Sequence, residues 1–113
     1  MIKIFHNPRC AKSRGGVAFL EEKGVSFEIV KYLDDPFTVE SLSQIIAVLK
    51  IKPLALVRKN EADWKHNFKG KELSDSQVIQ AMIDYPKLIE RPIVINFDRA
   101  VVARPTSLID QIL

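Results

Sequence analysis

The first thirty residues alternate between strand-like and helix-like patterns, and this order limits the fold more than any other feature. The apolar run 2–5 predicts a short buried strand that ends at Asn7-Pro8, because proline lacks an amide donor and keeps the preceding residue extended. Residues 11–23 follow a helical pattern, and Gly24 is placed to end it. Residues 25–30 then mostly alternate apolar and polar side chains, as a half-buried strand does. A strand, helix, strand unit of this kind normally pairs its strands in parallel, with a right-handed connection.

The middle of the chain predicts a helical insert, about residues 36–86, that interrupts the sheet. Apolar side chains between residues 39 and 49 follow one helix face, and Thr38 is a suitable N-cap. A second helix is expected to start at Ser74, where the sequence matches a capping box. The polar stretch 58–70 predicts a short helix with loops.

Two more strand-like runs, 92–97 and 100–103, are separated by Asp98-Arg99, a link short enough for an antiparallel hairpin. Pro105 suits the first turn of a last helix. The whole order predicts an α/β fold in which one mixed four-stranded sheet carries helices on both faces, together with the helical insert. A chain of 113 residues fits a single domain, residues 1–113, and is too short for two independent cores.

Charge and hydropathy exclude several functional classes. Lys and Arg number 17 against 14 Asp and Glu, a net charge of +3, and these residues are spread along the chain rather than gathered into the stripe of a nucleic-acid binder. No apolar run approaches the roughly 20 residues of a membrane span, and the first residues lack the core of a signal peptide. We therefore expect a cytoplasmic protein that binds small anions, with no nucleic-acid or membrane partner.

Cys10 is the only cysteine, and it stands between the first strand and the first helix. A thiol reacts as its thiolate, and a helix N-terminus beside cationic side chains lowers the thiol pKa. Arg9 is adjacent, Arg14 lies one helical turn downstream, and His6 could reach back from the strand end. The free backbone N–H groups that follow Cys10 could also cradle an oxyanion. A lone cysteine is more often a small buried hydrophobe, but the polar neighbours in residues 7–14 favour a reactive thiol here.

The spacing around Cys10 removes three known arrangements. A phosphatase loop of the C-x₅-R kind needs an arginine where this chain has Gly16, and a C-x-x-C pair needs a cysteine where it has Ser13. Ser13 could donate a hydrogen bond to the thiolate but cannot resolve a disulfide. One cysteine and two histidines argue against a zinc site. Any redox cycle must therefore take its second thiol from another molecule.

Arg91 and Arg104 each precede a proline, at the start of one predicted strand and the end of the next. Such positions can bring two guanidinium groups to one end of a sheet, where their planar forks suit a tetrahedral oxyanion. For any single arginine, however, a solvated charge is the more common state. The sequence leaves these two possibilities open.

Four ordered segments resemble the ArsC family, the glutaredoxin-linked arsenate reductases, and most closely its short members. The segments are His6-Asn7-Pro8-x-Cys10-x-x-Ser13-Arg14, Leu56-Val57-Arg58-Lys59-Asn60, Glu90-Arg91-Pro92-Ile93-Val94 and Arg104-Pro105. The resemblance covers essentially the whole chain. It implies a thioredoxin-like fold with a helical insert, and a cis peptide bond between Arg91 and Pro92.

The resemblance also implies a reaction. Cys10 corresponds to the nucleophile that attacks arsenate, and His6 and Ser13 correspond to residues that support its thiolate. Glutathione, as a co-substrate, supplies the second thiol, glutaredoxin resolves the glutathione adduct, and arsenite leaves. No tightly bound cofactor and no metal are implied.

The same resemblance also implies which residues bind the anion. Arg58, Arg91 and Arg104 correspond to three arginines that hold the oxyanion, and Arg14 is a further candidate because it lies one turn beyond the cysteine. Lys12 departs from the family pattern, since members tend to carry a small hydroxyl residue there. Two alternatives stay open: a glutathione-linked thiol/disulfide oxidoreductase without arsenate activity, and a regulator of the Spx type that binds RNA polymerase.

Overall fold

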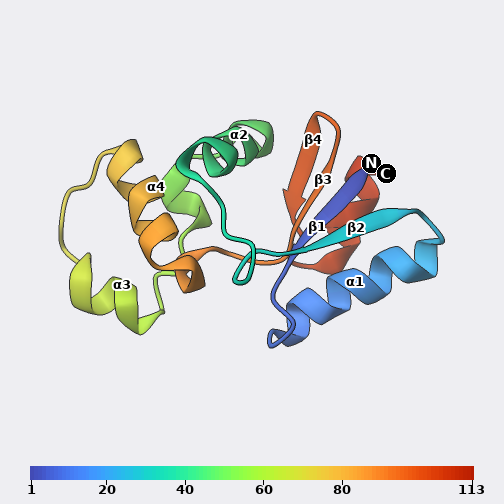
Figure 1. Cartoon of the computed structure of the whole chain (residues 1–113), viewed down its shortest axis with the longest axis horizontal. Helices are drawn as coiled ribbons and strands as arrows, with labels where there is room; N and C mark the ends of the chain where they lie inside the picture. The colour runs from blue at the N-terminus through green and yellow to red at the C-terminus, as the bar shows by residue number, and fades with distance from the viewer. The chain divides into compact units, whose positions relative to one another are not determined.

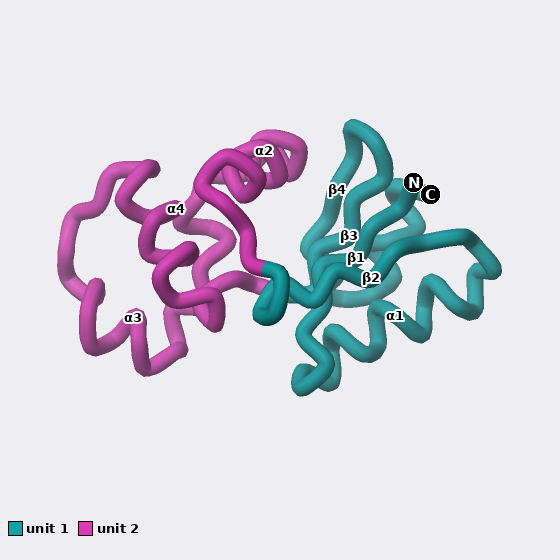
Figure 2. Tube along the Cα trace, viewed as in Figure 1, with its two compact units in different colours: residues 1–35, 91–113 teal, residues 36–90 magenta.

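The computed structural model describes all residues 1–113, and its helices and strands follow the predicted order (Figure 1). The chain forms two compact units, each described by itself: unit 1 comprises residues 1–35 and 91–113, and unit 2 comprises residues 36–90 (Figure 2). Unit 1 contains β1 (Ile2–His6), α1 (Ala11–Lys23), β2 (Phe27–Lys31), β3 (Ile93–Asn96), β4 (Arg99–Val102) and the 3₁₀ helix η3 (Thr106–Ile112). Unit 2 contains α2 (Val39–Leu49), η1 (Pro53–Leu56), α3 (Ala62–Asn67), α4 (Asp75–Asp84) and η2 (Pro86–Leu88).

Unit 1 is built on a mixed four-stranded sheet with strand order β2-β1-β3-β4. β1 and β2 are parallel and pair His6 with Lys31 at the end nearest the predicted site. β1 pairs antiparallel with β3, and β3 pairs antiparallel with β4. The predicted fold class, with its parallel N-terminal pair and its C-terminal hairpin, is confirmed.

The strand boundaries differ from the predicted ones by one or two residues. β2 begins at Phe27 rather than at residue 25. The hairpin link is Phe97-Asp98 rather than Asp98-Arg99, because Arg99 pairs with Asn96 across the two strands. Phe97 takes a φ of 60°, the left-handed conformation that two-residue hairpin loops require.

The last helix is a 3₁₀ helix rather than the expected α-helix, and Pro105 precedes it instead of lying in its first turn. Ile109 and Ile112 are both buried, and a helix with three residues per turn places these two side chains on the same side. The side-chain amide of Asn96 also donates to the Ile112 carbonyl at 2.6 Å, which ties the end of η3 to β3.

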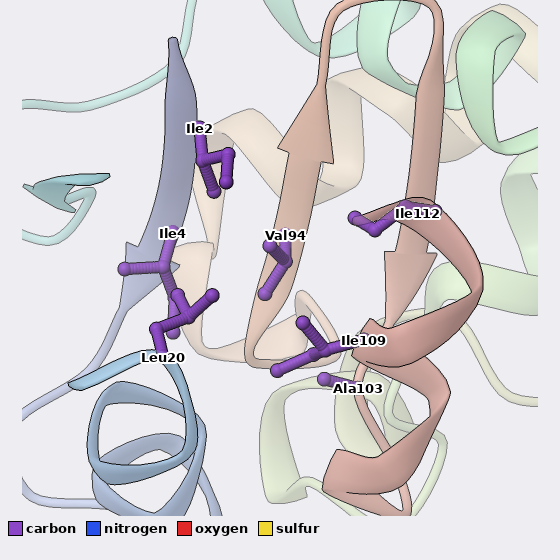
Figure 3. Close-up of a cluster of buried hydrophobic side chains, with 7 residues drawn as sticks. All are labelled: Ile2, Ile4, Leu20, Val94, Ala103, Ile109 and Ile112. Atoms are coloured by element: carbon purple, nitrogen blue, oxygen red, sulfur yellow. The ribbon is translucent and has the colours of Figure 1, made fainter. Parts of the chain in front are cut away.

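The core of unit 1 lies between one face of the sheet and the pair α1 and η3. Figure 3 shows its buried side chains, which come from the two central strands β1 and β3, from α1 and η3, and from the residue that follows β4: Ile2, Ile4, Leu20, Val94, Ala103, Ile109 and Ile112. Burial of this apolar surface fixes α1 against the sheet. The N-terminus of α1 is thereby held at the end of β1.

Gly16 allows α1 to lie unusually close to the sheet. A Cβ atom at this position would stand 2.9 Å from Cγ of Pro92 and 3.1 Å from Cδ1 of Ile4, both too short for carbon contacts. The first turns of α1 therefore lie directly beside Pro92. The Arg91-Pro92 peptide bond is cis, as the resemblance implied, and the Arg104-Pro105 bond is cis as well.

Unit 2 is helical, and two of its helices begin with the expected caps. Thr38 opens α2 with a capping box shared with Ser41, and Ser74 opens α4 with a capping box shared with Gln77. An isolated antiparallel bridge joins Val57 to Ile89 and so brings the segments on either side of it together. None of the helices in either unit combines the length and the apolar character that a bilayer crossing demands.

Candidate active site

Cys10 stands at the N-cap of α1, at the end of a tight turn that begins with Asn7. The Cys10 N–H donates to the Asn7 carbonyl at 3.0 Å, and the Cys10 carbonyl accepts the first helical hydrogen bond from Arg14 at 3.0 Å. Pro8 lies inside the turn, where a residue without an N–H group and with a fixed φ is well suited. The thiol is partly exposed. Strand end, turn and helix start therefore meet at this side chain, as the sequence predicted.

The pKa of the Cys10 thiol lies below its ordinary value. Burial raises this pKa, but the groups that favour the thiolate outweigh it: the backbone N–H groups of Ser13 and Lys12, and the side chain of Arg91 through both a hydrogen bond and its charge. The two N–H groups belong to the first turn of α1, where backbone donors have no helical partner. The predicted activation of the thiol thus has a physical basis in the helix start and in one arginine.

Arg91 and Arg104 converge on Cys10, which settles the question that the sequence left open. The Arg104 Nη2 atom lies 3.8 Å from the Cys10 Sγ atom and donates to it. The Arg104 Nε atom donates to the main-chain carbonyl of Arg91 at 2.7 Å, so the backbone at residue 91 orients the Arg104 side chain. Arg91 precedes β3 and Arg104 follows β4, and a hydrogen bond from the Ala103 N–H to the Pro92 carbonyl at 2.9 Å holds these two ends together. Both side chains are partly buried, which strengthens their effect on the thiolate.

Ser13 is fully buried, and its hydroxyl group faces His6 and Asn7 rather than the sulfur. The Asn7 N–H donates to the Ser13 Oγ atom at 2.9 Å, and the His6 Nδ1 atom lies 2.7 Å from it. Because the hydroxyl proton has no other partner, we assign it to the bond with Nδ1. No hydrogen bond joins this hydroxyl group to the Cys10 sulfur in the structure, and Ser13 favours the thiolate through its backbone N–H.

His6 is buried beneath the turn and is predominantly neutral at pH 7. Burial is the largest cause that lowers its pKa, and the charges of Lys31 and Arg14 lower it further, while a hydrogen bond with the Ser13 backbone raises it. A neutral imidazole can accept the Ser13 proton at Nδ1, as assigned above. His6 thus supports the turn that carries Cys10.

Arg14 clamps the turn rather than pointing at the thiol. Its Nη1 atom donates to the Pro8 carbonyl at 2.9 Å, and its side chain is exposed. The groups that lower the pKa of Cys10 do not include this guanidinium. These contacts neither support nor exclude the predicted role of Arg14 in anion binding.

Arg58 belongs to unit 2, where it is engaged by two carboxylates. Its Nη1 atom lies 2.5 Å from the Glu61 Oε1 atom, and its Nε atom lies 3.7 Å from the Glu90 Oε1 atom. Around the bridge between Val57 and Ile89, the Arg58 N–H donates to the Leu88 carbonyl at 2.7 Å and the Glu90 N–H donates to the Leu56 carbonyl at 2.9 Å, so both residues belong to the same pair of segments. The sequence interpretation missed both carboxylates, although Glu61 stands three residues beyond Arg58 and Glu90 directly precedes Arg91.

Known proteins match this chain along almost its whole length. The model of the ArsC family matches residues 5–112. An arsenate reductase of Neisseria meningitidis serogroup A is 39% identical over 114 residues, covering 99% of this chain and 97% of that protein. YfgD, an uncharacterized protein of Escherichia coli K12, is 40% identical over 114 residues, covering 99% of this chain and 96% of that protein.

The solved structure of an arsenate reductase from Vibrio cholerae superimposes with a TM-score of 0.94 at 38% identity, covering 99% of this chain and 97% of that one. The fold is thus the thioredoxin-like fold that the resemblance implied. The chain belongs to the ArsC family.

Proposed function

We propose that the protein is an arsenate reductase in which Cys10 is the nucleophile. The observation that carries this proposal is the convergence of Arg91 and Arg104 on a thiol whose pKa is lowered. A thiolate can attack arsenic, and two guanidinium groups can hold the oxyanion while charge develops on it. The names of the two arsenate reductases above give the same substrate.

The proposed cycle starts with the Cys10 thiolate. Its sulfur forms a bond to the arsenic of arsenate, and one arsenate oxygen leaves as water after it is protonated. A glutathione thiol then displaces a second oxygen, also as water, so that arsenic(V) carries both sulfurs. Because the chain has a single cysteine, this second thiol must come from outside.

Glutaredoxin completes the cycle. Its thiolate attacks the glutathione sulfur and forms a mixed disulfide, and the electron pair of the broken sulfur–arsenic bond stays on arsenic, which becomes arsenic(III). Hydrolysis of the remaining sulfur–arsenic bond releases arsenite and returns Cys10 as a thiol. Thiols of this kind persist in a reducing compartment, so we place the reaction in the cytoplasm.

The arginines and the buried polar residues take distinct parts in the proposal. Arg91 and Arg104 hold the arsenate oxygens, with Arg58 as a third anion-binding residue assigned from its place in the family motif. Arg14 adds positive charge at the same turn as the thiol. His6 and Ser13 hold the turn so that the thiolate keeps its stabilising contacts.

The first test measures arsenate-dependent consumption of NADPH by the purified protein with glutathione, glutaredoxin and glutathione reductase. We expect turnover by the wild type and none by Cys10→Ser. A wild-type rate no higher than that of the Cys10→Ser control would refute the proposal.

A second test separates arsenate reduction from general thiol chemistry. Arg104→Ala removes a guanidinium that the oxyanion needs, so arsenate turnover should be lost while exchange with a glutathione mixed disulfide is largely kept. Both reactions are compared at a pH above the thiol pKa, where all variants carry the thiolate. Loss of both reactions to the same extent would show that Arg104 serves the thiol chemistry in general rather than the oxyanion.

A further inference from the structure

Asn7 joins three parts of the active site through three hydrogen bonds. Its side-chain Oδ1 atom accepts from the Arg9 N–H at 3.0 Å. Its carbonyl accepts from the Cys10 N–H at 3.0 Å, and its own N–H donates to the Ser13 Oγ atom at 2.9 Å. The residue is 6% exposed, so most of its surface is shielded from water. The end of β1, the turn and the first turn of α1 are thus linked through one residue.

The side chain of Asn7 has a separate task from its backbone. An asparagine oxygen that accepts the N–H two residues further on forms an Asx turn, which sets the path of the chain through the residue between them. That residue is Pro8, whose φ is already fixed by its ring. The side chain therefore orients the peptide of Arg9, and Cys10 follows from it with φ −96° and ψ 121°, the extended conformation of an N-cap.

The position of Cys10 matters because the groups that favour its thiolate act over short distances. The N–H groups of Ser13 and Lys12 belong to α1, and the guanidinium groups of Arg91 and Arg104 belong to the hairpin segment. A turn that rotates or shifts moves the sulfur away from both sets at once. Hydrogen bonds to a charged group weaken steeply with distance and angle.

We propose that Asn7 is a positioning residue that fixes the place of the Cys10 thiol at the start of α1. It contacts neither the sulfur nor any reacting atom, and it acts through Arg9, Cys10 and Ser13. The proposal rests on the proposed function only in taking Cys10 as the nucleophile. It deepens that function by naming a residue on which the reactivity of the thiol depends.

The test is the pH dependence of Cys10 alkylation by iodoacetamide in Asn7→Ala, Asn7→Ser and wild type, with thermal unfolding measured in parallel. In Asn7→Ala the thiol pKa should rise, and alkylation at neutral pH should slow roughly three- to tenfold, equivalent to the loss of about one hydrogen bond. The limiting rate at high pH should change little. In Asn7→Ser the hydroxyl can form the same turn more weakly, so the values should lie between the two.

Asn67→Ala is the matched control, because it removes an amide that donates to the Asp63 carbonyl within unit 2. It should leave the titration of Cys10 unchanged. An Asn7→Ala protein that melts at a lower temperature but titrates like the wild type would overturn the proposal, since the residue would then be merely structural. If Asn7→Ala does not fold, Asn7→Ser decides by the same criterion.

The outcomes also distinguish this proposal from the proposed function. A wild-type thiol that titrates near the free value of about 8.5 would contradict both, because no activated thiolate would exist to be positioned. A lowered wild-type pKa together with unchanged Asn7 variants would contradict the role of Asn7 alone. A raised pKa in the Asn7 variants would support that role even if arsenate were not turned over, because the alkylation assay contains no arsenate, glutathione or glutaredoxin.

Discussion

Ser13 serves the active site through two different atoms. Its hydroxyl group is bonded to His6 and Asn7 in the interior, while its backbone N–H favours the Cys10 thiolate. A substitution that changes only the side chain therefore tests the first task and spares the second.

We expect Ser13→Ala to destabilise the fold more than it changes the thiol. The variant leaves the His6 Nδ1 atom and the Asn7 N–H without a buried partner, at a cost of about 1–3 kcal/mol in the free energy of unfolding. The N–H groups that act on the thiolate remain. Urea unfolding measures the first effect, and the pH dependence of alkylation measures the second. A thiol pKa that returns to its ordinary value at unchanged stability would show that the hydroxyl acts on the sulfur directly.

Arg91→Ala should raise the pKa of the Cys10 thiol, because it removes both a hydrogen bond and a positive charge from the thiolate. With a higher pKa less thiolate is present at neutral pH, so alkylation slows there and recovers as the pH rises above the new pKa. Arg99→Ala, an exposed arginine on β4, is the control. Titration curves that coincide for the two variants would contradict the assignment.

At the scale of single residues, the sequence predicted the identity of the site residues more successfully than it predicted their contacts. Cys10, Arg91 and Arg104 were identifiable from residue type and spacing, but their convergence depends on a hairpin register and on side-chain directions that no short motif encodes. Asn7 was visible only as half of a strand-breaking pair. The hydrogen bond that its side-chain oxygen accepts from the Arg9 N–H depends on the three-dimensional path of the turn.

At the scale of elements, α1 contains two neighbouring glycines, and only one of them affects how closely the helix packs. A Cβ atom at Gly16 would meet Pro92 and Ile4 at 2.9 and 3.1 Å, whereas a Cβ at Gly15 would meet only the Thr106 Cγ2 atom, at an ordinary 3.7 Å. Both residues lie inside the helix, where glycine costs backbone entropy. Only one of the two has a packing reason to be glycine.

The pair gives a matched prediction. Gly16→Ala should lower the free energy of unfolding by about 1–3 kcal/mol, because α1 or Pro92 must move to admit the methyl group. Gly15→Ala should raise it by about 0.5–1 kcal/mol through its higher helix propensity. Chemical denaturation measures both. Equal effects of the two substitutions would show that the close approach at Gly16 is not maintained in solution.

Most element types could be predicted from the sequence, and η3 is an exception. The N-cap residue Thr38, the capping box at Ser74 and the glycine at the end of α1 are local signals, and each marks a helix end correctly. η3 is different, since Ile109 and Ile112, which are buried against the sheet, would lie on the same side of an α-helix and of a 3₁₀ helix. The residue pattern is therefore compatible with either helix.

At the scale of the whole molecule, the chain divides at residues 36 and 90 into two compact units. The predicted insert, about 36–86, lies within unit 2, but it ends four residues before the unit does. η2 and the bridge between Val57 and Ile89 attach residues 86–90 to unit 2. That pairing joins positions far apart in the sequence, so local patterns could not reveal it.

The ion pairs of Arg58 lead to a prediction about substrate affinity. If Arg58 binds the oxyanion as proposed, arsenate must compete with the Glu61 carboxylate for the same guanidinium. Glu61→Gln should therefore lower the KM for arsenate about two- to fivefold, the range that a partly exposed ion pair supports, with a smaller change in kcat. Steady-state kinetics measure both constants.

Glu72→Gln is the control for this experiment, because it removes the same charge from an exposed position in unit 2. An equal fall in KM for both variants would indicate a general effect of net charge. An unchanged KM in Glu61→Gln would show that Arg58 does not bind the substrate.

The bond between Arg104 and the carbonyl of residue 91 bears on how such a site can change during evolution. A main-chain carbonyl is supplied by any amino acid, so Arg104 keeps its anchor when the side chain at position 91 is replaced. The two cations are therefore separable by mutation. A lineage that drifts away from arginine at position 91 retains an oriented guanidinium beside the cysteine, and can pass through intermediates that still bind anions on the way to another substrate.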